Sequence, residues 1–338
     1  MGRSLVFLVV FCIREIAALT VDPVWDRRTA LATATALAFP TSIDDNLRLR
    51  NTRIPRIGYS LYKTAPEQVE DGVKLAYDAG VRLFDVATQY GTNELVAPAL
   101  KGRSGVCLAH KISNAEQSIQ VSDVQESVMQ TSALFGQKLN LVMLHSPLTD
   151  SERRVASYRA LVELQQQKKI GAVGVCNFGV KPLQELVDAG LPPPAVIQLI
   201  LSPFNQHKDI AEWARVHGSV LSCSAWSKLS SVEGPQQGWA VVSDMAKEKG
   251  VTKQQILIRW ALQSGYLCAP RSGSKFKVER EAIVENAPKS IRTFELTREE
   301  MAVLNRLDEG ITAGKLGIYD GWDPSEIVDD KWDPTLLD

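Results

Sequence analysis

Short apolar runs alternate with longer amphipathic stretches along most of the chain. Runs of this length, bounded by turn residues, are typical of buried parallel strands. Eight of them occupy residues 56–61, 81–85, 105–110, 140–145, 170–175, 195–199, 219–225 and 266–270. Repeated strand–helix alternation indicates a parallel sheet with helices on its faces, and eight β–α pairs predict a closed (β/α)8 TIM barrel of the α/β class.

Helical patterns fill the gaps between the apolar runs. Their apolar residues recur at three- and four-residue spacing, and most of them end near a glycine. Examples span residues 67–80, 157–169, 208–218 and 254–265. The chain has no convincing tandem repeat and no linker long enough to separate two domains. We therefore expect a single barrel domain at residues 46–313, with an extension at each end.

Length and composition agree with this expectation. The chain has 338 residues, 45% of them hydrophobic, and a formal net charge of −1. These values suit one barrel of about 250 residues plus extensions. A sequence pI near 6.5 indicates no nucleic-acid surface, because such surfaces are strongly basic.

The cysteines are scattered along the chain and form no CxxC unit or His–Cys cluster that would suggest a metal site. They are Cys12, Cys107, Cys176, Cys223 and Cys268. We expect no metal, and we interpret these residues as small buried thiols in a reducing compartment.

Four ionisable side chains lie at or just after the ends of three consecutive strand-like runs: Asp85, Tyr90, Lys111 and His145. Parallel barrels keep their chemistry at strand carboxyl ends, so these groups are expected to meet. An isolated tyrosine titrates near 10. If Asp85 holds Lys111 and Lys111 faces the phenol, the ammonium lowers the pKa of Tyr90 and makes it a usable general acid. His145 would then orient a substrate carbonyl.

The segments FDVATQYG, LAHKIS and LVMLHSPL that carry these four residues together resemble the catalytic motif of the aldo-keto reductases. The resemblance extends from about residue 51 to about residue 286. It implies NADPH-dependent reduction of an aldehyde or ketone to an alcohol, with a hydride from nicotinamide and a proton from Tyr90. Each of the four residues taken alone is more commonly a surface charge or a satisfied buried polar group.

The same resemblance implies three contacts to the nicotinamide. Asn177, in GAVGVCNF, and Gln198 match the residues that bind the carboxamide, and Trp226 matches the aromatic residue that stacks on the ring. Cys176 stands where the family usually has serine. Alternatively, Asn177 caps the next helix, Gln198 is a polar residue at a strand end, and Trp226 packs against a loop.

The segment CAPRSGSKFKVEREAIVEN resembles the family's adenosine-phosphate loop and the helix that follows it. Arg271 and Ser272 match the residues that meet the 2′-phosphate of NADPH, and a guanidinium suits bidentate phosphate contact. Glu285 and Asn286 match the pair that faces adenine.

The stretch between Ser272 and Glu285 is longer than is usual in the family. Arg280 is the candidate for the family's second phosphate-binding arginine, with Lys275 and Lys277 as substitutes. The two lysines also fit a solvated basic surface.

The first 45 residues are predicted to be a targeting leader that is removed. Residues 1–13 contain the run LVFLVVFCI, which is too short to span a bilayer but suits a signal peptide. Arg27 and Arg28 precede an Ala-rich run that ends in a cleavage-like site at residues 36–38. This layout resembles the bipartite leaders of plastid proteins. A disordered extension or an incorrect start codon are the alternatives, and the protein is then cytoplasmic or enters the secretory pathway.

The tail at residues 314–338 is rich in Trp, Asp and Pro, and contains the WDP unit twice. In the reductases, tails in this position often fold over the barrel mouth, so Tyr319, Trp322 or Trp332 are candidates to line the substrate pocket. The other interpretation is that the tail packs against the outside of the barrel.

Two further functional classes fit parts of the sequence. A non-catalytic, nucleotide-binding regulatory subunit would share the family motifs. A barrel hydrolase needs two carboxylates at strand ends, but the sequence has only Asp85 so placed. We expect a monomer that acts on a small carbonyl compound, without a nucleic-acid partner and without a membrane after the leader is removed.

Overall fold

The computed structural model describes residues 46–49, 52–224, 236–272 and 279–310. The predicted leader, the predicted tail, Trp226, Lys275 and Lys277 lie outside these residues.

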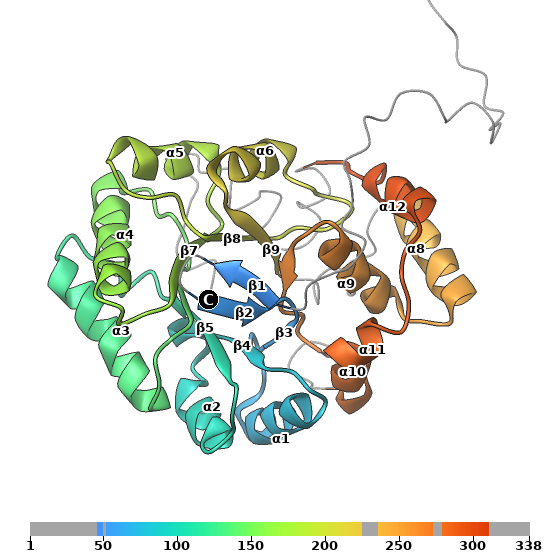
Figure 1. Ribbon diagram of the computed structural model, residues 1–338, viewed down its shortest axis with the longest axis horizontal. Coiled ribbons are helices and arrows are strands. Elements are labelled where there is room, and N and C mark those ends of the chain that lie inside the picture. The colour runs from blue at the N-terminus through green and yellow to red at the C-terminus, as the bar shows by residue number, and fades with distance from the viewer. Residues whose placement is uncertain (1–45, 50–51, 225–235, 273–278, 311–338) are drawn as a thin grey trace, which may run out of the picture. The chain divides into compact units, whose positions relative to one another are not determined.

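Eight parallel strands form a ring, which confirms the predicted (β/α)8 barrel (Figure 1). In spatial order they are β3 (Gly58–Ser60), β4 (Leu83–Ala87), β5 (Cys107–Ile112), β6 (Leu141–Leu144), β7 (Ala172–Cys176), β8 (Val196–Leu199), β9 (Val220–Cys223) and β10 (Leu267–Cys268). The last strand returns to the first through a parallel bridge between Ile57 and Cys268. Two backbone hydrogen bonds support this contact, from Cys268 to Arg56 at 2.9 Å and from Ser60 to Pro270 at 3.2 Å.

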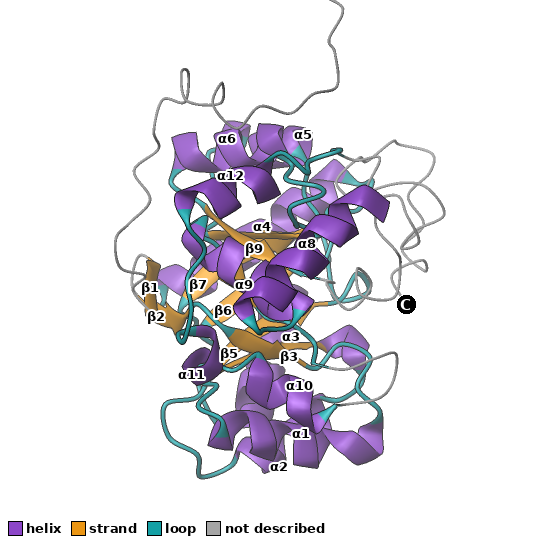
Figure 2. Cartoon of the chain, turned by 90° about the vertical axis from the view of Figure 1, so that its right-hand side faces the viewer, coloured by secondary structure: helices purple, strands orange, loops and turns teal. Residues whose placement is uncertain are grey.

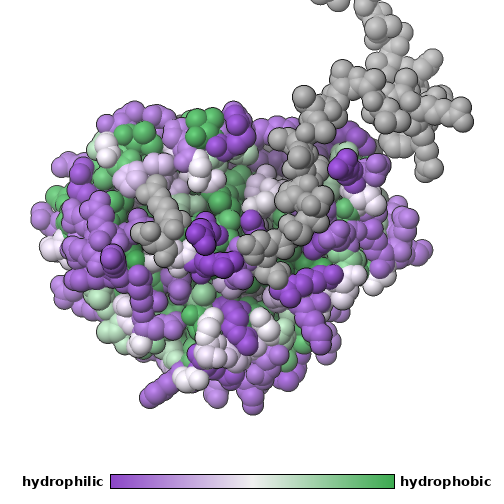
Figure 3. Space-filling view, viewed as in Figure 1, coloured by the Kyte–Doolittle hydropathy of each residue, from purple (hydrophilic) through white to green (hydrophobic). Residues whose placement is uncertain are grey.

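Helices surround the ring of strands (Figure 1). They are α1 (Pro66–Asp78), α2 (Asn93–Leu100), α3 (Val121–Phe135), α4 (Ser151–Gln166), α5 (Val180–Asp188), α6 (Lys208–His217), α8 (Gln236–Lys249), α9 (Lys253–Gln263), α10 (Arg280–Glu285), α11 (Pro288–Ile291) and α12 (Arg298–Asn305). Capping boxes begin α9 at Thr252 and α12 at Thr297. In each, the threonine hydroxyl accepts from the backbone N–H three residues on, and the side chain of that residue accepts from the threonine backbone N–H. The outer rim of the view in Figure 3 is largely hydrophilic, as expected for amphipathic helices that bury one side.

A two-stranded antiparallel hairpin, β1 (Asn46–Leu49) and β2 (Thr52–Pro55), precedes the barrel. It lies across one end of the ring of strands (Figures 1 and 2). Leu49 and Ile54 are buried in one cluster with Leu83, Leu141 and Leu267, which stand at the starts of their strands. The hairpin therefore covers the amino ends of the strands and leaves the carboxyl ends for chemistry.

Three strands continue further than the sequence predicts: β7 by one residue, to Cys176, and two others by two residues. The runs were expected to end at Asp85 and at His110, but β4 continues to Ala87 and β5 to Ile112. Backbone pairing of Asp85 with Ala109 and of Ala87 with Lys111 maintains the ladder. A polar side chain inside the barrel does not interrupt backbone pairing, so polarity marked the strand ends too early.

Candidate active site

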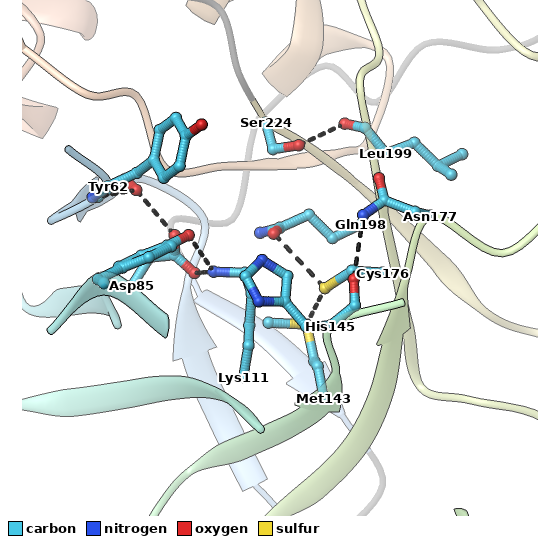
Figure 4. A network of polar contacts seen from close by, with 12 residues as sticks. Tyr62, Asp85, Lys111, Met143, His145, Cys176, Asn177, Gln198, Leu199 and Ser224 are labelled. Atoms are coloured by element: carbon cyan, nitrogen blue, oxygen red, sulfur yellow. Dashed lines mark hydrogen bonds and ion pairs between the residues drawn. The ribbon is translucent and has the colours of Figure 1, made fainter. Parts of the chain in front are cut away.

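Lys111 is the centre of a polar cluster inside the barrel (Figure 4). Its ammonium forms an ion pair with Oδ1 of Asp85, and its Nζ donates to the Tyr90 hydroxyl at 3.1 Å. Ser60, at the end of β3, donates to Oδ2 of Asp85 at 2.9 Å. Asp85 and Lys111 are only 3% and 1% exposed. The carboxylate is therefore satisfied on both oxygens, and the lysine is held against the phenol.

Tyr90 comes from a short 3-10 helix, η1 (Thr88–Tyr90), that follows β4 directly. Gly91 ends this turn in the left-handed conformation, with φ of 64°. The Tyr90 ring lies 5.3 Å from the Tyr62 ring and 5.9 Å from the His145 ring, measured between centroids. Tyr62 was not among the predicted site residues. Its position just after β3 was the signal available, because the chemistry of these barrels gathers at strand carboxyl ends.

The electrostatics of Tyr90 differ from the sequence-based expectation. Burial raises the pKa of Tyr90 well above its ordinary value, and the nearby Asp85 adds to this effect, although Lys111 lowers it. The expected net lowering is wrong because the phenol has left water, and this burial outweighs the charge of Lys111, which Asp85 also opposes. Burial would lower the pKa of Lys111, but Asp85 and Tyr90 raise it above its ordinary value. At neutral pH the pair is therefore a protonated phenol beside an ammonium ion.

His145 follows β6 and is buried beside the cluster. Burial, followed by the charge of Lys111, lowers the pKa of His145 to about 3. The imidazole is therefore neutral at physiological pH and offers one N–H donor and one acceptor. Asn177 donates from Nδ2 to the backbone carbonyl of His145 at 3.0 Å, which ties the end of β7 to the end of β6.

The proposed carboxamide-binding residues lie side by side. Asn177 has a positive φ of 62° directly after β7, and Cys176 pairs with Gln198 of β8 in the sheet register. Asn177 is not a helix cap, because Gly179 is the residue that precedes α5. The Cys176 thiol lies 3.6 Å from Oε1 of Gln198 and 3.8 Å from the sulfur of Met143 (Figure 4). Burial raises the pKa of this thiol to about 12, so it remains protonated.

The proposed phosphate site follows β10. Arg271 is 7% exposed and donates from Nη2 to the backbone carbonyl of Lys63 at 3.0 Å. Asn286 donates from Nδ2 to the Ser272 hydroxyl at 3.2 Å. Asn286 is 4% exposed, and its Oδ1 has no hydrogen-bond partner among the described residues.

The other two predicted adenosine contacts are less enclosed. Arg280 is exposed at the first position of α10, and Glu285 is half-buried at the last position. Gln255, which the sequence did not single out, donates from Nε2 to the backbone carbonyl of Glu285 at 3.0 Å. The structure therefore brings Ser272 and Asn286 together, but shows no contact of Arg280 with them.

The described residues contain no group of three or more His, Cys, Asp or Glu side chains suited to a metal ion. Within the same residues, no helix is long and apolar enough to cross a membrane.

Sequence comparisons match this chain to reductases. The sequence model of the Aldo/keto reductase family matches residues 57–309. The chain is 29% identical over 283 residues to the putative methylglyoxal reductase DkgA of Salmonella typhi, covering 82% of this chain and 97% of that protein. It is 30% identical over 268 residues to an aldo-keto reductase of Mycobacterium sp. (strain KMS), covering 77% of this chain and 92% of that protein.

Solved structures share the same fold. The crystal structure of Gox0644 in its apo form gives a TM-score of 0.70 at 25% identity, covering 78% of this chain and 93% of that chain. A mutant of Gox0644 in complex with NADPH gives a TM-score of 0.71 at 24% identity, covering 84% of this chain and 98% of that chain.

Proposed function

Because this chain belongs to the aldo/keto reductase family of oxidoreductases, we propose that it reduces an aldehyde or ketone to an alcohol with NADPH. The single observation that carries the proposal is the Asp85–Lys111–Tyr90 chain of contacts beside a neutral His145. This set provides a proton donor and a group that orients a carbonyl oxygen.

In the proposed reaction, Tyr90 donates its hydroxyl proton to the carbonyl oxygen of the substrate. When bound, NADPH supplies the hydride that the carbonyl carbon receives. Lys111 stabilises the phenolate that remains, because its ammonium is already 3.1 Å from the hydroxyl oxygen. Asp85 keeps that ammonium in place. The neutral imidazole of His145 orients the carbonyl oxygen, and positioning of this kind removes part of the entropic barrier.

The described residues fit the proposed cofactor. Oδ1 of Asn286 is a buried acceptor that no described residue contacts by a hydrogen bond, and an exocyclic amine such as that of adenine would satisfy it. Arg271 and Ser272 would hold the 2′-phosphate, since a guanidinium suits bidentate phosphate contact. Asn177 and Gln198 would hold the carboxamide. Arg280 and Glu285 are further candidates at the surface of α10.

The names of similar proteins suggest a substrate class to test. Proteins similar to this chain carry the name methylglyoxal reductase, so a small 2-oxoaldehyde is the first compound to test. Purified protein is mixed with NADPH and with methylglyoxal, a simple aldehyde, an aldose or a diketone, and the loss of NADPH absorbance is followed. We expect turnover with at least one of them. NADPH binding without turnover of any carbonyl, in either direction, would contradict the proposal and favour a regulatory subunit.

A further inference from the structure

The carboxylate of Glu116 accepts hydrogen bonds from three separate segments. Thr88 of η1 donates its hydroxyl to Oε1 at 3.1 Å, and Ser127 of α3 donates to the same oxygen at 2.5 Å. The backbone N–H of Ser113 donates to Oε2 at 2.6 Å. None of the proposed catalytic or cofactor-binding residues is a member of this cluster.

Two of these three contacts lie near proposed catalytic residues in the sequence. Thr88 begins the turn that ends in Tyr90, and Ser113 lies two residues after Lys111 in the segment that leaves β5. Inside the barrel, Lys111 joins β5 to Tyr90 directly. Outside the strands, Glu116 joins the same two segments a second time. The η1 turn that carries Tyr90 is therefore held on the inner side of the strands by Lys111 and on the outer side by Glu116.

His110 shows which side of the wall Glu116 occupies. Its neighbours at alternate positions, Leu108 and Ile112, belong to the cluster that packs against the helices, so His110 points the same way. The Nε2 of His110 lies 3.5 Å from the Thr88 hydroxyl. Burial lowers the pKa of His110 to about 4, so at neutral pH it is an uncharged neighbour of the Thr88–Glu116 contact.

Glu116 binds these three donors as an ionised carboxylate. Burial raises its pKa, but hydrogen bonds from Ser127, Ser113 and Thr88 lower it, and the net change is downward. An ionised carboxylate is an acceptor only, so three donors match it. Thr88, Glu116 and Ser127 also line a surface cavity of about 500 Å³ between η1, α2 and α3. Water can therefore reach the space that a shorter side chain would leave.

A turn of three residues has few backbone hydrogen bonds of its own, and in η1 Gly91 donates to Thr88 at 3.1 Å. We infer that Glu116 is a positioning residue: by holding Thr88 it fixes the Tyr90 hydroxyl at its working distance from Lys111. This inference rests on the proposed function, because it assigns a task that exists only if Tyr90 is the proton donor.

The test compares Glu116→Ala, Glu116→Gln and Thr88→Val in the full chain. Thr88→Val removes the hydroxyl and keeps the side-chain shape. A displacement of about 1 Å costs roughly a hundredfold in rate, so we expect Thr88→Val and Glu116→Ala to lower kcat about ten- to hundredfold. Their dissociation constants for NADPH should stay within about twofold of wild type. Glu116→Gln should recover most of the loss, because its amide oxygen can accept from the Ser113 N–H while its NH2 donates to the Thr88 and Ser127 hydroxyl oxygens.

Ser157→Ala is the matched control. Ser157 is buried in α4 and makes two hydrogen bonds to Ser118, at 3.0 and 3.1 Å, in the same loop as Glu116. This variant should lower the melting temperature as much as Glu116→Ala does, yet keep kcat within about twofold of wild type. An equal loss of kcat in Ser157→Ala would reduce the effect to general destabilisation and overturn the inference. Failure of Glu116→Gln to recover activity would also overturn it.

Tyr90→Phe separates this inference from the function on which it rests. In the Tyr90→Phe background, Glu116→Ala should change the residual rate by less than about twofold, because there is no hydroxyl left to position. If Tyr90→Phe itself keeps full activity, the proposed function fails. If Tyr90→Phe is inactive while Glu116→Ala and Thr88→Val keep wild-type kcat, only the role of Glu116 is rejected.

Discussion

The catalytic end of the site and the phosphate end are organised differently. At the catalytic end, Lys111 is buried between Asp85 and Tyr90, and charged and polar side chains contact one another directly. At the phosphate end, the contacts include a bond from Arg271 to a backbone carbonyl and a bond from Asn286 to Ser272. The first region pairs opposite charges within the protein. In the second, the buried amide oxygen of Asn286 has no hydrogen-bond partner among the residues that the structure describes.

This difference indicates how each region would contribute to the rate of the reaction and to the affinity for the cofactor. Groups that are fixed before a reaction stabilise developing charge without reorganising, which favours rate. Groups whose remaining hydrogen bonds would be completed by a ligand favour affinity and selectivity. Changes at the catalytic end should therefore act on kcat, and changes at the phosphate end should act on the dissociation constant of the cofactor.

Tyr90→Phe should have the largest effect. Loss of the proton donor should lower kcat by about a hundred- to ten-thousand-fold, the usual range for general acid catalysis, while the dissociation constant for NADPH stays nearly constant. Steady-state kinetics and a fluorescence titration with NADPH measure the two quantities. Substantial remaining reductase activity would mean that Tyr90 is not the proton donor. The proposed division into a region that sets kcat and a region that sets cofactor affinity would then fail.

Lys111→Met should also lower kcat by roughly a hundredfold or more, because the ammonium that lowers the pKa of Tyr90 is gone. It also leaves the Asp85 carboxylate buried and unpaired, which typically costs about 3–5 kcal/mol of stability. The double variant Lys111→Met/Asp85→Asn is the control, and urea unfolding should show its stability restored while its kcat stays low. A double variant that regains activity would mean that Lys111 only stabilises the fold.

Acid should destabilise the catalytic end through its two buried histidines. Folding lowers the pKa of His110 to about 4 and of His145 to about 3, so below pH about 6.5 the unfolded chain binds more protons than the folded one. The contribution of each histidine to the free energy of unfolding is therefore fully present above that pH and is lost towards pH 4, by an amount on the order of 3 kcal/mol at about 1.4 kcal/mol per pKa unit.

Urea unfolding at several pH values measures this slope. The variant His110→Gln has one titrating group fewer, so its stability should fall less steeply between pH 6.5 and 4 than that of wild type. Equal slopes would mean that His110 does not titrate differently in the folded and unfolded chains.

Arg271→Ala tests the phosphate end. It should weaken NADPH binding by about 1.5–3 kcal/mol, the range for a hydrogen bond to a charged group, and leave NADH binding and kcat nearly unchanged. Isothermal titration with both cofactors measures the difference. An equal loss for NADPH and NADH would indicate that Arg271 only supports the loop at Lys63, and a wild-type preference for NADH would reject the phosphate site.

Removal of the predicted leader should have the smallest effect. A chain that starts at Thr41 keeps the β1–β2 hairpin, which packs on the amino ends of the barrel strands. We therefore expect unchanged folding, NADPH binding and kcat, measured side by side with the full chain. Mass spectrometry of the protein from its native cells tests whether processing occurs there. A shortened chain that does not fold, or an intact Met1 in native material, would contradict the targeting interpretation.

Much of the fold was predictable because local patterns determine local structure. All eight predicted apolar runs overlap a barrel strand, since a continuous apolar run suits a strand that is buried on both faces. Residues 46–55 were predicted as part of the barrel domain but not as a separate hairpin. What the hairpin covers depends on Leu83, Leu141 and Leu267, which are distant in the sequence.

The grouping of the candidate site was predictable in part. Polar residues after consecutive parallel strands must meet at one edge, and Lys111 does contact both Asp85 and Tyr90. Tyr62, Ser60 and Glu116 were missed, because their residue types are common and only neighbours in space give them a task. The catalytic and cofactor-binding roles of the predicted residues stay predictions until the variants are measured.

The sequence by itself determined the order and type of the elements and the kinds of side chain that reach the carboxyl ends of the strands. Only the tertiary structure decided how deeply those side chains are buried and which charges face them. Burial raises the pKa of Tyr90, which the sequence suggested would fall, and it lowers that of His145 to about 3. The physical reason is that element type depends on neighbours along the chain, whereas desolvation and Coulomb energy depend on distances between residues that the sequence keeps far apart.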